Sequence, residues 1–218
     1  MNNIVIVGDS LAFNRPDSLS NEQRWPVLLG EKLPGYKVNN LSMGSSTSNR
    51  FKKLSHSLLS DNDILVVQIG VVDCAPRLFS KLENKMISVM PQPVSKKIIA
   101  FFKKRRTQSQ TRAYVSLRKF ENNLLQLFNK YKDTAILYIK ILPASTKYIS
   151  SNPAVSKAID QYNSIIDVCA KNFPNVQLIG LSNHNIDNLT LEDGYHLNAE
   201  GHLLVSGLLA SSIQKIKK

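Results

Sequence analysis

Three side chains of this sequence have the types that acyl transfer through a hydroxyl group requires: Ser10, Asp193 and His196. A serine hydroxyl is a poor nucleophile at neutral pH, so it needs an imidazole to accept its proton and a carboxylate to orient that imidazole. Asp193 and His196 stand three positions apart in EDGYHLNAEGH, which puts both on the same side of a turn or of a helix start. The sequence thus contains all three groups, and the fold must bring them together.

Each of these residues also has an ordinary structural interpretation. Ser10 follows the apolar run IVIV and Gly8, a position where serine often caps a helix. Asp193 and His196 fit a turn aspartate and a surface histidine, and Asp9 fits an aspartate that accepts bonds from turn amides. The catalytic interpretation is favoured because a glycine precedes Ser10 and because the Asp-x-x-His pair opens the last predicted helix.

The elements that would position these residues follow an alternating pattern of short apolar runs and helical periodicity, which is typical of a parallel α/β fold. The run ILVVQIG is apolar almost throughout, as expected for a strand that is covered on both faces. Strands are predicted at residues 3–7, 37–41, 64–69, 135–141 and 176–179. Helices are predicted at residues 22–33, 49–59, 111–131, 154–172 and 198–216. This order predicts one domain over residues 1–218, with the sheet in the middle layer of a three-layer sandwich.

In a parallel sheet the carboxyl ends of the strands form the ligand-binding edge. Three strand ends would deliver Ser10, Gly44 and the loop of residues 70–73 to that edge. A glycine at position 44 lets a backbone N–H approach a developing oxyanion without obstruction by a side chain. A glycine that only makes a turn would look the same in the sequence, and the two roles are compatible.

Residues 76–110 do not fit this pattern, because a short connection is expected between the third strand and the long helix. Residues 76–112 contain ten Lys or Arg residues and one acid, Glu83, so they carry +9 of the net charge of +12. Within them, IIAFF at residues 98–102 is flanked by lysine pairs. One interpretation is that this run is a short amphipathic element, with residues 96–106 as a candidate contact with a membrane surface or a partner. A solvated, partly ordered excursion with a small apolar anchor is the simpler interpretation.

Four short blocks of the sequence carry a family resemblance. GDSL at residues 8–11, NLSMGSS at 40–46, GVVD at 70–73 and DGYH at 193–196 resemble, in order and spacing, the blocks of the GDSL or SGNH hydrolases. The resemblance implies a flavodoxin-like α/β/α sandwich with a five-stranded parallel sheet, and metal-free hydrolysis or transfer of acyl esters. It also implies that Ser10 is the nucleophile, His196 the general base and Asp193 the orienting carboxylate. Backbone N–H groups of Ser10 and Gly44 would form part of the oxyanion hole.

One block departs from the family pattern. The third block usually reads G-x-N-D, and its Asn donates to the oxyanion, whereas this chain has Val72 at that position. The loss of one oxyanion donor typically costs on the order of 10²–10³ in rate. Candidate substitutes, and tentative substrate contacts, are Asn14, Arg15, Gln68 and Arg77. Asp73 is a tentative substrate contact as well, although pairing with Arg77 four residues on is the simpler expectation.

Several function classes are disfavoured. Asp9, Asp193 and His196 lack further ligands at recognisable spacing, so neither a metal nor another cofactor is expected. Cys74 and Cys169 are expected to be free buried thiols in a reducing, cytoplasmic compartment, with peripheral membrane contact left open. Nucleic-acid binding is disfavoured because KKIIAFFKKRR has no accompanying recognition motif.

Three hypotheses remain. The stretch GVVDCAPR resembles a variant found in SGNH proteins linked to surface-polysaccharide biosynthesis, which favours an O-acetyl esterase or O-acetyltransferase acting on a carbohydrate that could be anionic. A lipid esterase or lysophospholipase is the alternative within the enzyme class. A non-catalytic module that binds an anionic glycan is the alternative outside it.

Overall fold

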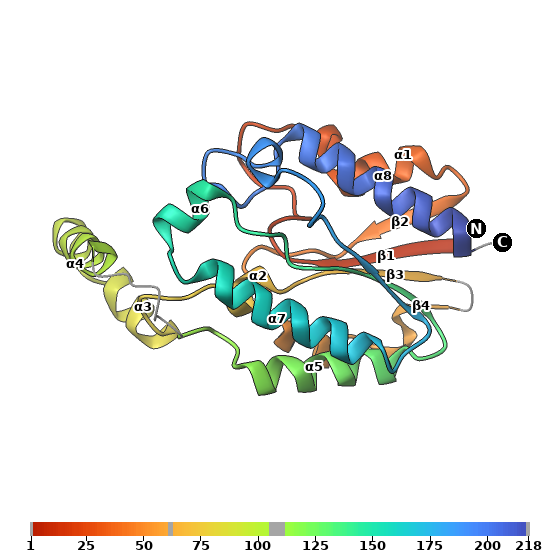
Figure 1. The fold of residues 1–218 in the computed structure, drawn as a ribbon, viewed down its shortest axis with the longest axis horizontal. Coiled ribbons are helices and arrows are strands. Elements are labelled where there is room, and N and C mark those ends of the chain that lie inside the picture. The colour runs from red at the N-terminus through yellow and green to blue at the C-terminus, as the bar shows by residue number, and fades with distance from the viewer. Residues whose placement is uncertain (1, 61–62, 105–111, 217–218) are drawn as a thin grey trace.

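The computed structural model describes residues 2–60, 63–104 and 112–216, and its centre is a five-stranded, all-parallel sheet with the order β2-β1-β3-β4-β5 (Figure 1). The strands are β1 (Asn2–Gly8), β2 (Tyr36–Asn40), β3 (Ile64–Gln68), β4 (Ala135–Ile139) and β5 (Val176–Ile179). All five predicted strands are therefore confirmed within two residues at each end. Every residue of β3 is buried, as its continuous apolar run indicated.

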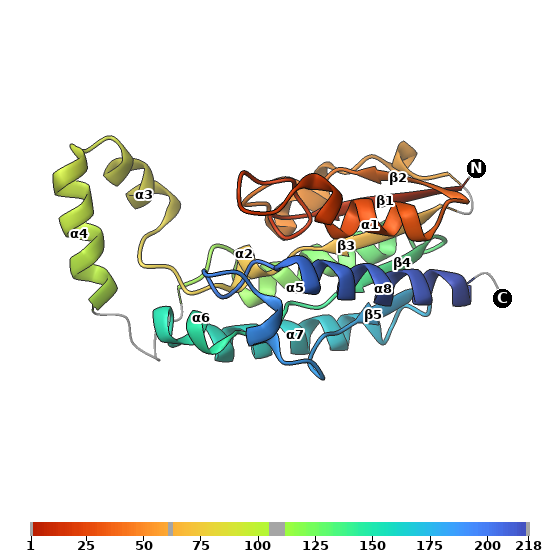
Figure 2. The same ribbon diagram turned by 90° about the horizontal axis from the view of Figure 1, so that it is seen from above.

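Helices cover both faces of this sheet. Helices α1 (Trp25–Lys32) and α8 (Ala199–Ile216) pack together on one face, and α5 (Leu117–Lys130) and α7 (Val155–Ala170) pack together on the other (Figures 1 and 2). The predicted three-layer α/β/α sandwich is confirmed. No helix in the described parts of the chain has the length and apolar character needed to cross a membrane.

Helix α5 shows why the periodicity predicted the helix but not its start. Phe120, Leu124 and Leu127 form the apolar stripe, and all three are fully buried. The prediction began at residue 111, but the helix starts at Leu117, after Ser116 in an extended N-cap conformation. The segment just before the helix is held in a non-helical conformation by Val115. Its side chain is buried, and its backbone N–H donates to the Asp73 carbonyl. Residue 111 itself lies outside the described residues.

The predicted helix at residues 49–59 is wrong. The structure has two short 3₁₀ helices there, Ser48–Lys53 and His56–Leu58, separated by extended backbone at Leu54 and Ser55. Ser48 is fixed by bonds to Asp73, and the Ser55 hydroxyl accepts from the Ser57 N–H. Such local side-chain bonds to the backbone compete with a continuous α-helix.

The region of the basic insertion is more regular than expected. It forms α3 (Lys81–Ser88) and α4 (Gln92–Lys104), and the IIAFF run lies within α4. Both helices stand clear of the layered body at the end of the sheet where the strands finish (Figures 1 and 2). Residues 105–110 of the insertion lie outside the described residues. The remaining short helices are α2 (Val71–Cys74), α6 (Thr146–Ser151) and the 3₁₀ turns Asn21–Gln23 and Ile186–Leu189.

Candidate active site

The turn that follows β1 brings Ser10 to the edge of the sheet. Its sharpness depends on Gly8, because a Cβ there would lie 2.6 Å from the Ser42 Oγ and 2.7 Å from the Ala12 Cβ. Asp9 then stabilises the turn: its N–H donates to the Gln68 carbonyl at 3.0 Å, and its carboxylate accepts from the Leu11 N–H at 3.0 Å.

Ser10, His196 and Asp193 meet in a continuous chain of hydrogen bonds. The Ser10 Oγ lies 2.9 Å from the His196 Nε2, and the His196 Nδ1 lies 2.6 Å from the Asp193 Oδ2. A carboxylate can only accept, so the proton on the imidazole is on Nδ1, and Nε2 is left to accept from the serine hydroxyl. The fold therefore brings together three groups whose arrangement suits removal of a proton from Ser10.

The loop of Asp193 holds its carboxylate in the ionised form. Partial burial by itself would raise the pKa of Asp193, but the bonds from the His196 ring and from the backbone N–H groups of His196 and Tyr195 outweigh it. The pKa falls from 3.8 to about 2. The loop itself requires Gly194, whose φ is +76° and where a Cβ would lie 2.5 Å from the Ser145 Oγ.

The segment after β2 carries Gly44 and is joined to the turn of Ser10 where the Met43 N–H donates to the Gly8 carbonyl at 3.1 Å. Among the described residues, no acceptor takes a bond from the backbone N–H of Ser10 or of Gly44. A Cβ at Gly44 would meet nothing within 4 Å, so the protein leaves open space there. The following residue, Ser45, has a φ of +58°, a left-handed conformation that is uncommon for a residue other than glycine and that is found preferentially at functional sites.

Asp73 was a tentative substrate contact, and the structure contradicts that assignment. The side chain is fully buried, and it accepts from the Ser48 N–H at 2.9 Å and from the Ser48 Oγ at 2.6 Å. The Asn123 amide donates in turn to the Ser48 Oγ at 2.8 Å. Asp73 thus connects the segment that follows Gly44 to α2 and α5, and it has no surface on which to touch a substrate.

The structure also contradicts the assignment of Gln68 as a substrate contact. It is buried below the site, and its Oε1 accepts from the Trp25 Nε1 at 3.0 Å. Trp25 is fully buried, and its backbone N–H donates to the Nδ1 of His202 at 3.2 Å. Burial, and then repulsion from Arg24, lower the pKa of His202 to about 4, so this histidine is neutral at pH 7 and structural.

Asn14 and Arg15 also fall outside the pocket at Ser10. Asn14 is exposed, and Arg15 forms an ion pair with Asp17 at 3.0 Å. Of the tentative substrate contacts, only Arg77 lines this pocket.

The pocket itself has a volume of about 280 Å³ and includes three residues that no sequence motif indicated. Its wall is formed by Ser10, Ser45, Val71, Val72, Pro76, Arg77, Tyr114, Tyr148, Asn152 and Tyr195. These three are Tyr114, Tyr148 and Asn152, which are isolated polar residues in loops and in the short helix α6. Ser45 lies inside the block NLSMGSS. Tyr195 had a signal, its place inside DGYH, and its ring stacks on His196 with 3.9 Å between ring centroids.

Arg77 is held at the pocket wall by contacts on two sides. One guanidinium nitrogen donates to the Val72 carbonyl at 3.2 Å, and the guanidinium lies over the Tyr114 ring at 4.5 Å. Within the described residues the lining of the pocket contains no Asp or Glu, so a positive charge faces a largely neutral, tyrosine-rich wall.

Metal-ligand geometry does not occur in the described residues: no three His, Cys, Asp or Glu side chains gather there. Both cysteines are free and buried, as predicted.

The buried carboxylate of Asp9 gives a prediction about stability. Burial, and then repulsion from Asp73, raise its pKa from 3.8 to about 7 against the bond from Leu11. The folded protein therefore keeps a proton that the unfolded chain gives up, and the free energy of unfolding falls as the pH rises from about 4 to about 7. Asp9→Asn removes this decline, so we expect the variant to gain about 2 to 4 kcal/mol relative to the wild type between pH 4.5 and pH 8.

Urea unfolding of both proteins at the two pH values measures this difference. Asp133→Asn, at an exposed position, is the matched control and is expected to show no such gain. An Asp9→Asn effect that is the same at both pH values would show that Asp9 is ionised in the folded state throughout.

Comparison with known proteins gives a family and a fold. A family model described as the GDSL-like lipase/acylhydrolase family matches residues 6–204. None of the curated proteins matches the sequence.

Solved structures match over almost the whole chain at low sequence identity. A lipase/acylhydrolase from Enterococcus faecalis has 16% identity and a TM-score of 0.68, over 99% of this chain and 96% of that one. Est24, a carbohydrate acetylesterase from Sinorhizobium meliloti, has 14% identity and a TM-score of 0.62, over 99% and 100%. The esterase EstA from Pseudoalteromonas sp. has 19% identity and a TM-score of 0.60, over 99% and 98%. At these identities the likeness shows the fold.

Proposed function

The chain belongs to the GDSL-like lipase/acylhydrolase family, and from this premise we propose that Ser10, His196 and Asp193 are the catalytic triad of an enzyme that acts on an acylated carbohydrate. The observation that carries the proposal is the chain of contacts at 2.9 Å and 2.6 Å from Ser10 through His196 to Asp193. The reaction is removal of an O-acyl group, with acetyl as the expected group, or its transfer to another hydroxyl. The carbohydrate is a surface polysaccharide or its precursor.

In the first half of the reaction the Ser10 Oγ attacks the carbonyl carbon of the ester while the His196 Nε2 takes the hydroxyl proton. The negative charge that develops on the carbonyl oxygen is met by the backbone N–H groups of Ser10 and Gly44. When the tetrahedral intermediate collapses, His196 returns the proton to the sugar oxygen, which leaves as a hydroxyl. The acyl group remains as an ester on Ser10.

In the second half, His196 takes a proton from the acceptor, and the acceptor oxygen attacks the acyl carbon. Ser10 leaves with the proton from His196. A water acceptor gives a free carboxylic acid, and a sugar hydroxyl gives a new ester. The two outcomes use the same residues, and they differ in how well the acylated pocket excludes water.

The pocket supports a carbohydrate rather than an acyl chain as the group that lies beside Ser10. Tyr114, Tyr148 and Tyr195 offer aromatic faces and hydroxyl groups, and Asn152 adds a buried amide. Arg77 adds a guanidinium that suits a carboxylate. We therefore propose an anionic sugar, and Est24, a carbohydrate acetylesterase, is a structural neighbour with the same fold.

Lipid esterase activity is a second candidate, and one observation favours it. An apolar groove of about 580 Å³ lies against Leu78, Phe79 and Met86 and shares Arg77 with the pocket of Ser10. An acyl chain in that groove would favour long-chain esters. p-Nitrophenyl esters with acyl chains of two to twelve carbons decide between the candidates. The carbohydrate proposal predicts the highest kcat/KM for the acetate. A maximum at acyl chains of eight carbons or more would support the lipid candidate.

Substrate charge is tested with a matched pair: O-acetylated methyl glucuronide, which has a carboxylate, and O-acetylated methyl glucoside, which has a hydroxymethyl group there. We expect the wild type to release acetate from the glucuronide with the higher kcat/KM. Arg77→Gln should reduce that preference about 10-fold, because a charge-assisted hydrogen bond is lost. Activity on p-nitrophenyl acetate should change little.

Arg118→Gln, an exposed position on α5, is the control and should keep the preference. Equal activity of the wild type on the two sugars would contradict the anionic substrate. Activity on p-nitrophenyl acetate with none on either sugar would contradict the carbohydrate.

A further inference from the structure

Exposed apolar side chains gather in the two helices that stand off the body. We call residues 81–104, with α3, α4 and their connection, the α3–α4 unit. Six large apolar residues are exposed within it. Val89, at 80%, and Leu82, at 70%, are the most exposed of all large apolar residues in the described chain. The six are Leu82, Met86, Val89, Val94, Phe101 and Phe102. An exposed apolar group of this size indicates an interaction site.

Helix α4 has the pattern of a helix that lies at an interface between water and an apolar phase. Val94, Ile98 and Phe101 are spaced by four and three residues and form one face. Lys96 lies on the opposite side of the helix and Lys97 borders that face, and both are exposed. The sequence repeats a lysine pair seven positions later. Helix α4 keeps part of this face exposed, with Val94 at 47% and Phe101 at 51%. A basic amphipathic helix with an exposed apolar face is typical of membrane-surface binding.

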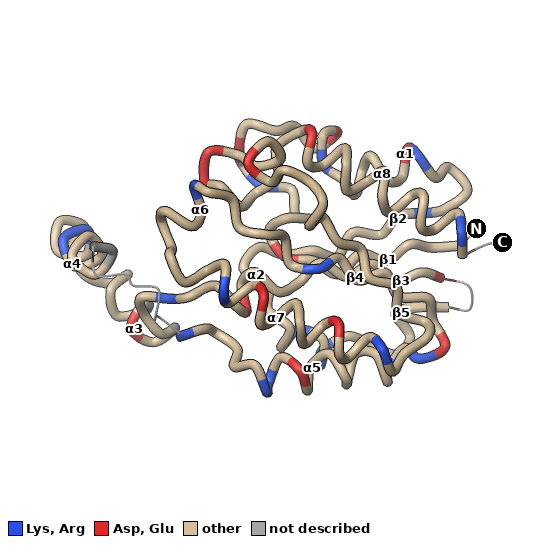
Figure 3. Tube along the Cα trace, in the orientation of Figure 1, with Lys and Arg blue, Asp and Glu red and all other residues tan. Residues whose placement is uncertain are grey.

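The charge around these helices points to an anionic surface. Residues 76–104 contain seven Lys or Arg residues and one acid. That acid, Glu83, forms an ion pair with Arg112 at 2.7 Å. Figure 3 shows blue segments on and beside α3 and α4, while red and blue alternate along the body. A second copy of this chain is a poor occupant, because two such surfaces would bring like charges together.

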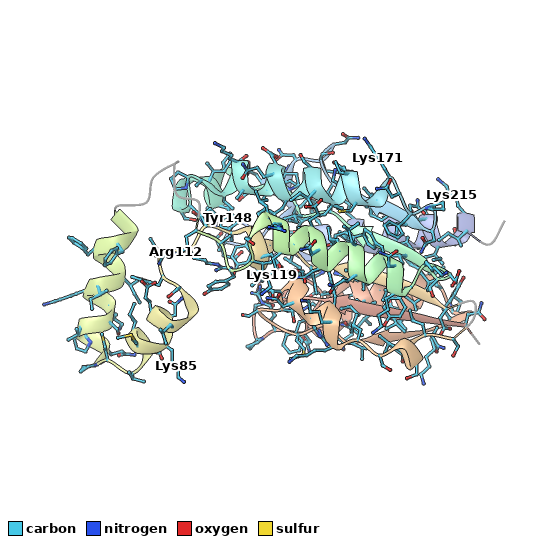
Figure 4. All side chains as sticks on the ribbon, turned by 90° about the horizontal axis from the view of Figure 1, so that it is seen from below. Lys85, Arg112, Lys119, Tyr148, Lys171 and Lys215 are labelled. Carbon is cyan, nitrogen blue, oxygen red and sulfur yellow. The ribbon has the colours of Figure 1, made fainter. Side chains whose placement is uncertain are left out.

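The unit is held in a defined place beside the active site. Arg77 precedes the unit in the chain and Arg112 follows it. These two residues are hydrogen-bonded, because the Arg77 N–H donates to the Arg112 carbonyl at 2.8 Å. Asn84 of α3 donates to the hydroxyl of Tyr114, a residue that lines the pocket of Ser10, at 3.1 Å. The ring of Phe79, just before the unit, contacts that of Phe102 in α4 edge-on, with 5.1 Å between ring centroids. Figure 4 shows Arg112 between the unit and the body, and Tyr148, which lines the pocket of Ser10, at the end of the body that faces the unit.

We propose that the α3–α4 unit binds the surface of a bilayer that contains anionic lipid. Its apolar residues enter the headgroup region and its lysines contact lipid phosphates, which holds the pocket of Ser10 close to the membrane. The binding does not depend on the acyl chemistry at Ser10, so its failure and that of the proposed function are separate results.

Sedimentation of the full chain with vesicles tests the proposal. We expect binding to vesicles of three parts phosphatidylcholine to one part phosphatidylglycerol, and binding that is at least about 10-fold weaker to pure phosphatidylcholine. Val89→Ser/Phe101→Ser should weaken binding to the mixed vesicles at least about 10-fold. Lys96→Gln/Lys97→Gln should weaken it as well and reduce its salt dependence.

The matched control is Val168→Ser/Leu203→Ser, which removes two apolar side chains exposed at 58% and 53% on α7 and α8. It should bind as the wild type does. Activity on p-nitrophenyl acetate should be equal in all four proteins, which shows that each is folded.

Three results would overturn the proposal. The first is no binding of the wild type to mixed vesicles, and the second is equal weakening by the control. The third is a dimer, detected by light scattering, that Val89→Ser/Phe101→Ser dissociates while vesicle binding is unchanged. This would assign the surface to a second copy of the chain.

Discussion

Replacing Ser10 with alanine is expected to lower kcat/KM for p-nitrophenyl acetate by at least about 10⁴-fold. The variant loses the oxygen that attacks the ester, so no acyl-enzyme can form, while the fold is unaffected because the Ser10 Oγ contacts His196 at the open edge of the pocket. His196→Ala should cost about as much, because the serine then has no acceptor for its proton. Residues that act as one unit are not additive, so the double variant should be no worse than either single variant.

Labelling with a fluorophosphonate, detected by intact mass, separates an activated serine from a serine that is merely exposed. We expect one adduct on the wild type and none on Ser10→Ala or His196→Ala. The controls are Ser18→Ala and His184→Ala, which change exposed residues outside the pocket and should still be labelled.

The absence of an adduct on folded wild-type protein would contradict the triad as a working nucleophilic site. The pocket would then belong to a non-catalytic module, and glycan binding that is unchanged in Ser10→Ala would support that conclusion.

The groups of the triad were predictable because their signals are local. The apolar run of β1 predicts a buried strand that ends at Gly8, and the pair Asp193 and His196 was indicated by its spacing and by its place before the last predicted helix. Their meeting was not deducible from spacing, since 186 residues separate Ser10 from His196. It follows from the parallel sheet, whose strand ends all lie at one edge.

The wall of the pocket was not predictable, because its residues carry no periodic signal. Tyr114 lies in an irregular segment and Tyr148 in the short helix α6, and only the tertiary fold turns them toward Ser10. For Asp73 and Gln68 the error was the opposite one: their polar side chains were assigned to the substrate site, where they do not lie. Both follow or end β3 at the correct edge, but they are buried one layer below the surface and hydrogen-bonded there.

The basic insertion shows the limit of reasoning from composition. Its charge and its apolar run were visible in the sequence, and a short amphipathic element at residues 98–102 was one interpretation. Helix α3 and the full length of α4 were not predicted, because loop length and charge runs favour a solvated segment. The capping box at Ser80 and Glu83, in which each residue binds the backbone of the other, was the local signal for the start of α3.

Replacing Val72 with asparagine is expected to raise kcat for p-nitrophenyl acetate by about 10- to 100-fold with little change in KM. Family members usually have Asn at this position of the third block, where its amide donates to the oxyanion. Val72 lines the pocket together with Ser10, and its side chain has no donor. An added donor would act on the transition state, where charge is on the oxygen, more than on the bound ester, so kcat should change rather than KM.

Val71→Asn is the matched control, because Val71 also lines the pocket and is equally buried, but it does not occupy the Asn position of the block. It should not raise kcat. An unchanged kcat in Val72→Asn would mean that another group already supplies the third donor. Arg77 is then the first residue to test, because it is the one cation in the described lining of the pocket. In that case Arg77→Gln should lower kcat for p-nitrophenyl acetate in the wild type, and Val72→Asn should restore it.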